Sequence, residues 1–121
     1  MLLTRITVAA LLLGFTAACS SSSSPSTPTA SGSTVSVSIV SGASTLTSTA
    51  YAPNPIAVSV GGTVTWTNND TMSHTATATN GAFSSGTIAP NGKFSMTFPT
   101  AGSFPYHCTF HPGMVGTVTV Q

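Results

Sequence analysis

Apolar and polar residues alternate along several short segments in the C-terminal two-thirds of the chain. Residues 35–39 are Val-Ser-Val-Ser-Ile, and residues 56–60 follow the same pattern as Ile-Ala-Val-Ser-Val. A period of two puts every second side chain on one face, which is typical of a half-buried β-strand. The same criterion predicts five further strands, at residues 63–67, 74–79, 93–98, 103–108 and 115–120.

Turn-forming residues separate these segments, among them Gly61-Gly62, Asn80-Gly81 and Asn91-Gly92. Seven or eight short, evenly spaced strands predict an all-β fold, a two-layer antiparallel β-sandwich with Greek-key connections. Pro105 lies inside a predicted strand and has no N–H, so we expect either that this strand is an edge there or that its nitrogen faces no partner. Residues 41–55 show little periodicity and predict a loop.

The first 18 residues have a different character. Arg5 closes a short basic start, and residues 6–18 form an apolar run. A membrane-spanning helix needs about 20 such residues, so residues 1–18 are predicted to be a signal peptide. The apolar run ends in Thr16-Ala17-Ala18-Cys19. This motif resembles a bacterial lipoprotein processing box, in which Cys19 becomes the lipidated N-terminus. Simple secretion after signal cleavage remains the alternative, and either route exports the protein.

Residues 19–34 are rich in Ser, Thr and Pro and include five consecutive serines. Such a segment has too little apolar surface to offset the entropy of ordering. We therefore expect a tether at 19–34 between a lipid anchor and a domain at 35–121. The expected location is periplasmic or cell-surface.

Charge is almost absent, because only Arg5, Asp70 and Lys93 carry formal charges. Nucleic-acid binding needs many basic side chains, and a coiled coil needs charged flanking positions, so both classes are excluded. We expect Asp70 and Lys93 to lie on the rim of any binding site. Two rim charges would give almost no electrostatic steering of a partner protein.

One short segment concentrates metal-binding side chains. Cys108, His111 and Met114 follow one another at intervals of three residues, in the connection before the last predicted strand. His74 begins another predicted strand, which can pack beside this connection. Two His and one Cys with a weak axial Met form the donor set of blue-copper electron-transfer sites. The pattern therefore predicts one copper ion, cycling between Cu(I) and Cu(II).

The chain resembles the cupredoxins, and most of all the plastocyanin- and amicyanin-like group. The resemblance covers about residues 35–121 and includes the four donor residues in family order. It also includes three upstream motifs: Tyr51-x-Pro53-x-x-Ile56, the Gly-Gly-Thr-Val-Thr-Trp-Thr-Asn of residues 61–68, and the Gly-Ser-Phe-Pro-Tyr-His-Cys of residues 102–108.

This resemblance implies site residues of three kinds. The copper ligands would be His74, Cys108, His111 and Met114. Thr75 and Thr109, each directly after a ligand, would tie the two ligand loops together. An apolar docking patch around the edge of His111 would consist of Met72, Phe110, Pro112 and Gly113.

The function implied is that of an exported, membrane-tethered, monomeric carrier of single electrons between redox proteins, not of an enzyme. Copper buffering or delivery is the alternative. His107 directly precedes the Cys and could reach a second copper, as in copper nitrite reductases. A catalytic copper needs about three His ligands and His107 is the only spare one, so we favour a single metal; the role of His107 stays open.

Overall fold

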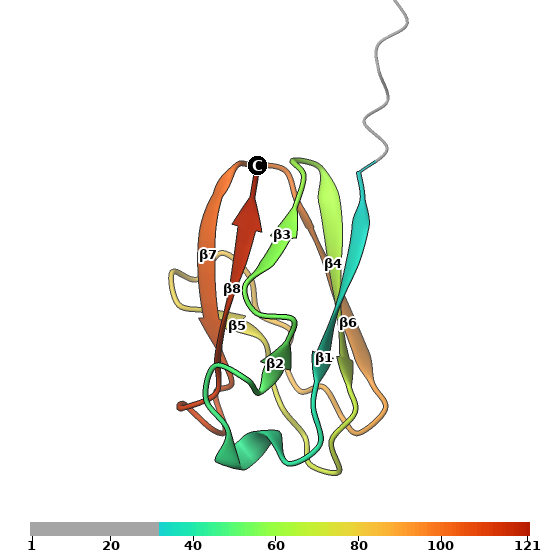
Figure 1. Ribbon diagram of the computed structural model, residues 1–121, viewed down its shortest axis with the longest axis vertical. Helices are drawn as coiled ribbons and strands as arrows, with labels where there is room; N and C mark the ends of the chain where they lie inside the picture. The colour runs from blue at the N-terminus through green and yellow to red at the C-terminus, as the bar shows by residue number, and fades with distance from the viewer. Residues whose placement is uncertain (1–31) are drawn as a thin grey trace, which may run out of the picture.

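The computed structural model describes residues 32–121, which form a β-sandwich (Figure 1). The predicted signal peptide, Cys19 and most of the predicted tether lie outside these residues. Among the described residues, no helix has the length and apolar character needed to cross a membrane. The elements are β1 (Thr34–Ile39), the 3₁₀ helix η1 (Ala43–Thr45), β2 (Tyr51–Ala52), β3 (Ile56–Val58), β4 (Gly62–Asn68), β5 (Thr77–Ala78), β6 (Lys93–Phe98), β7 (Gly102–His107) and β8 (Val115–Val120).

Two four-stranded sheets make the two layers, in the orders β2-β1-β4-β6 and β3-β8-β7-β5. The predicted all-β sandwich is confirmed. Both sheets are mixed, because β1 pairs in parallel with β4 and β3 pairs in parallel with β8. Parallel neighbours need a crossover between them. Here the chain leaves the first sheet after β2, adds β3 to the second sheet, and returns as β4 beside β1.

Alternation in β4 builds the centre of the core. Val64 and Trp66 point inward and are fully buried, whereas the threonines between them are only partly buried. The Trp66 ring lies 5.6 Å from that of Phe94 on its own sheet and 5.5 Å from that of Tyr106 on the other, between centroids, so it contacts side chains from both sheets. Trp66 is therefore a core residue, as its alternating strand predicts.

The strand predicted at 74–79 is much shorter than expected, because only Thr77 and Ala78 belong to β5. The backbone of His74 instead exchanges two hydrogen bonds with Ile88, as an isolated bridge to a loop. The N–H of Ala76 donates a hydrogen bond to the side-chain hydroxyl of Ser85. Residues 41–55, which were predicted to be a loop, contain η1 and the two-residue strand β2. A strand of two residues is too short to produce a visible alternation in the sequence.

Pro105 lies in β7 between β8 and the chain that follows β5, so β7 is not a free edge there. The carbonyl of Pro105 accepts a hydrogen bond from the N–H of Thr79, just beyond the two-residue pairing of β5 with β7. In an antiparallel ladder the nitrogen and carbonyl of one residue face the same side. The proline nitrogen therefore faces the β5 side of β7, where only one of the two hydrogen bonds of an antiparallel pair can form.

Candidate metal centre

Three donor side chains meet, carried by two connections between strands. The connection from β7 to β8 lies at the end of the sandwich opposite the C-terminus (Figure 1). His74 lies in the connection from β4 to β5, and Cys108 and His111 lie in the connection from β7 to β8. Each histidine offers one ring nitrogen to a metal, and Cys108 offers its sulfur. These three atoms all lie within 4.8 Å of one another. The structure thus brings together three of the four predicted ligands from segments 34 residues apart in sequence.

The spacing of these atoms suits one metal ion. The sulfur of Cys108 is 3.8 Å from Nδ1 of His74 and 3.8 Å from Nδ1 of His111. With the bond lengths that zinc makes to the same ligand types, a trigonal ion would hold nitrogen and sulfur about 3.7 Å apart. A thiol has only one proton to share between two facing nitrogens. A bound cation satisfies all three donors at once.

Met114 belongs to the same tight loop and is fully buried. Its carbonyl accepts a hydrogen bond from the N–H of Cys108, and its own N–H donates to the carbonyl of His111. These two hydrogen bonds fold the loop back on itself and hold His111 and Met114 close to Cys108. This local geometry is the reason why the spacing was informative in the sequence.

The sulfur of Cys108 is fully buried and accepts a hydrogen bond from the backbone N–H of Thr75, at 3.3 Å. The backbone of the His74 loop thus contacts the sulfur of the other ligand loop directly. The Thr75 carbonyl in turn accepts a hydrogen bond from the hydroxyl of Tyr51, at 2.5 Å. Burial raises the pKa of Tyr51 far above its usual range, so this hydroxyl stays a donor.

The two ligand loops are tied together by threonine side chains. The N–H of Thr109 donates to Oγ1 of Thr75 at 2.9 Å, and the two hydroxyls lie 3.3 Å apart. The hydroxyl of Thr77 also donates to Oγ1 of Thr75. The cross-loop contact expected of Thr75 and Thr109 is therefore present in the structure.

Asp70 is a site residue that the sequence reasoning missed. It was expected to be a rim charge, but it is only 6% exposed and its Oδ2 lies 2.8 Å from Nε2 of His74. Hydrogen bonds from His74 and from the N–H of Gly42 lower the pKa of Asp70 to about 2. The rim assignment is therefore wrong, because a lone carboxylate at position i−4 from a histidine can reach its far nitrogen.

The two histidines differ in exposure: His74 is fully buried, whereas His111 is partly exposed. Of the four residues expected in the docking patch, Met72 is 47% exposed and Phe110 is 52% exposed. Pro112 and Gly113 are exposed as well. All four residues expected in the docking patch are therefore on the surface.

His107 is not part of the donor cluster. It ends β7, where it pairs with Thr77 on one side and Val115 on the other. Within residues 32–121, His74, Cys108 and His111 are the one group of three or more His, Cys, Asp or Glu side chains that could hold a metal. The described part of the chain thus offers no second site to His107.

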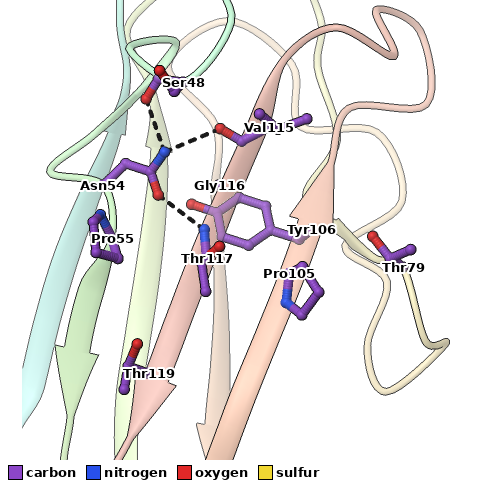
Figure 2. Close-up of a pocket in the computed structure, with 10 residues that line it drawn as sticks. All are labelled: Ser48, Asn54, Pro55, Thr79, Pro105, Tyr106, Val115, Gly116, Thr117 and Thr119. Carbon is purple, nitrogen blue, oxygen red and sulfur yellow. Dashed lines mark hydrogen bonds between the residues drawn. The ribbon is translucent and has the colours of Figure 1, made fainter.

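A shallow surface groove of about 530 Å³ lies along the second sheet, without any of the donor residues (Figure 2). Across one side of it, the side-chain amide of Asn54 binds the edge of β8. Its nitrogen donates to the carbonyls of Ser48 and Val115, and its oxygen accepts from the N–H of Thr117. Asn54 thereby replaces a neighbouring strand where β3 does not reach. The groove is lined by Ser48, Asn54, Pro55, Thr79, Pro105, Tyr106, Val115, Gly116, Thr117 and Thr119.

Known proteins show the same fold and sequence pattern. Amicyanin from Paracoccus denitrificans is 38% identical over 76 residues, covering 59% of this chain and 58% of amicyanin. Plastocyanin from Scenedesmus fuscus is 33% identical over 84 residues, covering 59% of this chain and 86% of plastocyanin. The solved purple cupredoxin from Nitrosopumilus maritimus superimposes with a TM-score of 0.67 at 34% identity, covering 72% of this chain and 99% of that one.

The chain spans less than two thirds of the length of the matched amicyanin. The family described as copper-binding proteins of the plastocyanin/azurin type matches residues 35–121. Together with the nitrogen and sulfur donors, this match identifies one copper ion as the cofactor. The expected resemblance is confirmed, and the chain belongs to the plastocyanin/azurin family of copper-binding proteins.

Proposed function

We propose that this protein is an exported carrier of single electrons, not an enzyme, with His74, Cys108, His111 and Met114 as its copper ligands. The observation that carries the proposal is the convergence of two imidazoles and one buried thiol, with a buried thioether in the same loop. The relatives named amicyanin and plastocyanin support it. When bound, copper supplies the one-electron chemistry by alternating between its two oxidation states.

The protein's own residues hold the donors from outside. Asp70 fixes one imidazole, and the N–H of Thr75 is bound to the sulfur of Cys108. The Thr75–Thr109 contact joins the two loops that carry these donors. Donors fixed in this way have little freedom to move when the charge of the metal changes, which favours fast electron transfer.

The face around His111 is the proposed docking site for redox partner proteins. Its imidazole is partly exposed and lies among exposed apolar side chains. Within residues 32–121 the only formal charges are Asp70, which is buried, and Lys93. A partner would therefore be recognised by apolar contact and shape rather than by charge, and we propose that the carrier is a monomer.

The proposed location is outside the cytoplasm, with a lipid on Cys19 and residues 19–34 as a tether. Support comes from the sequence of residues 1–34. Labelling cells with a radioactive fatty acid tests it. Incorporation by the natural chain and none by Cys19→Ala is the expected result, and an unlabelled natural chain that is released into the medium would contradict the anchor.

The experiment that tests the function is copper loading of the purified protein. With one equivalent of Cu(II) we expect strong visible absorption and a narrow copper hyperfine splitting in the EPR spectrum, both from the Cys108 thiolate. Cys108→Ser should abolish both signals. His107→Ala, one residue away, should keep both and still bind one copper per chain.

A pale protein with an ordinary tetragonal EPR signal would contradict this assignment of Cys108. Complete transfer of Cu(I) to a competing chelator within seconds would favour copper buffering or delivery over electron transfer. A carrier should retain its metal much longer, because Cys108 and Met114 are fully buried.

A further inference from the structure

The chain has a single acidic side chain, Asp70, and the fold buries it directly behind His74. Its Oδ1 accepts hydrogen bonds from the N–H of Gly42 at 3.0 Å and of Thr71 at 2.8 Å. Its Oδ2 is left for Nε2 of His74, at 2.8 Å. Both carboxylate oxygens therefore have defined partners, and the side chain is fixed in one orientation.

The backbone around Asp70 is fixed as well. The N–H of Asp70 donates to the side-chain oxygen of Asn68, whose amide nitrogen donates to the carbonyls of Met72 and Ile88. Gly42 belongs to the connection from β1 to η1, so Asp70 also joins this connection to the ligand loop. This amount of support is more than a solvent-facing charge would have.

Within residues 32–121 the one Lys or Arg is Lys93, and the side chain that faces Oδ2 of Asp70 is His74. A thiolate at Cys108 and a carboxylate at Asp70 together carry two negative charges. A divalent cation balances both, whereas a monovalent cation leaves one buried negative charge uncompensated.

We propose that Asp70 is a positioning residue which holds His74 as the Nε2–H tautomer, directs its Nδ1 toward Cys108, and favours the divalent state of the bound metal. The inference rests on the proposed copper site. It predicts that Asp70 lowers the reduction potential of the protein and strengthens its binding of Cu(II) more than that of Cu(I). Loss of such an outer partner of a ligating histidine typically weakens metal binding about 10- to 100-fold.

Asp70→Asn is the main test, because it removes the charge with almost no change in shape. If its oxygen keeps the N–H groups of Gly42 and Thr71, its NH₂ group faces Nε2–H of His74, and two donors oppose each other. We expect a higher reduction potential and a fall in Cu(II) affinity of about 10- to 100-fold, with a smaller fall for Cu(I). Asp70→Glu keeps the charge and should shift the potential less.

Asn69→Ala is the matched control, since Asn69 is the exposed neighbour and binds Ser38 instead of the site. It should leave the potential and both affinities unchanged. An unchanged potential in a folded Asp70→Asn protein would overturn the proposal. So would an equal shift in Asn69→Ala.

A second measurement does not depend on the folding of a variant. A long-range ¹⁵N–¹H correlation spectrum of the metal-free natural protein reports which ring nitrogen of His74 carries the proton when no metal occupies Nδ1. A proton on Nε2 is expected, and a proton on Nδ1 would overturn the proposal. Failure of the copper site itself would appear separately, as a natural protein without the thiolate absorption.

Discussion

The two segments that carry the donors are built in different ways. Residues 108–114 supply Cys108, His111 and Met114 from one tight loop, closed by two backbone hydrogen bonds within it. Residues 68–75 supply only His74, which is fixed by Asp70 and by an isolated bridge to Ile88. One segment is organised locally, and the other takes its shape from contacts with distant parts of the chain.

The difference also divides the roles of the two histidines. His74 is fully buried, with its far nitrogen bound to a carboxylate. His111 is partly exposed, and its Nδ1 lies 3.8 Å from the sulfur of Cys108. The buried histidine therefore belongs to the scaffold that fixes the metal, whereas the exposed one is placed to meet a partner.

The largest expected effect separates the two histidines by chemical rescue. In His111→Gly, added imidazole can enter from the surface and should restore the copper spectrum. In His74→Gly the gap is buried, so imidazole cannot enter without displacing the side chains packed around it. We expect imidazole to restore His111→Gly at a concentration at least about tenfold lower, a difference of about 1.4 kcal/mol. Equal rescue in a spectroscopic titration would contradict the proposed division.

A smaller effect should follow from cutting the tie between the segments. Thr75→Val keeps the shape of the side chain but leaves the N–H of Thr109 without its acceptor. A lost hydrogen bond of this kind costs about 1–2 kcal/mol. Urea unfolding of the metal-free protein measures it. The control Thr67→Val, on the partly exposed face of β4, should change the stability by less than about 0.5 kcal/mol.

The two tyrosines test how tightly the protein is packed behind the His74 segment. Tyr51, bonded behind Thr75, has a pKa raised far above its usual range by burial, and burial raises the pKa of Tyr106 to about 12. Both hydroxyls ionise near pH 10 in an unfolded chain. Their neutral forms therefore stabilise the fold fully below about pH 10, and this stability is lost as the pH rises toward about 12.

An absorbance titration of the folded protein should accordingly show little tyrosinate below about pH 11. In denatured protein both tyrosines should ionise with a midpoint near pH 10, and ionisation should be almost complete by about pH 11. Ionisation of one tyrosine near pH 10 in the folded protein would contradict the rigid packing behind the His74 segment.

The smallest expected effect concerns the exposed side. Since Asp70 and Lys93 cancel within residues 32–121, electron self-exchange between two copies should depend little on salt. Raising the ionic strength from about 0.01 M to about 0.15 M shortens the screening length from about 30 Å to about 8 Å. NMR line broadening should show less than about a twofold change in rate over this range. A steep dependence would mean that charge takes part in docking.

Local patterns were enough to predict much of the molecule. Alternation predicted β1, β4, β6, β7 and β8 to within two residues at each end, because a half-buried strand repeats every two residues. The Cys108 loop could be recognised because its donors are close in sequence. The strand predicted at 74–79 was wrong over most of its length, because hydrogen bonds to Ile88 and Ser85 replace the ladder.

By itself, the sequence determined the sandwich class, the donor types and the family, all of which depend on side-chain chemistry and short-range periodicity. The tertiary structure alone decided that Asp70 is buried against His74 and that Thr75 binds both Cys108 and Thr109. It also decided that β1 runs parallel to β4. Asp70 is only four residues from His74, but its orientation also depends on the N–H of Gly42, and the other contacts join segments far apart in the sequence, so no local pattern records them.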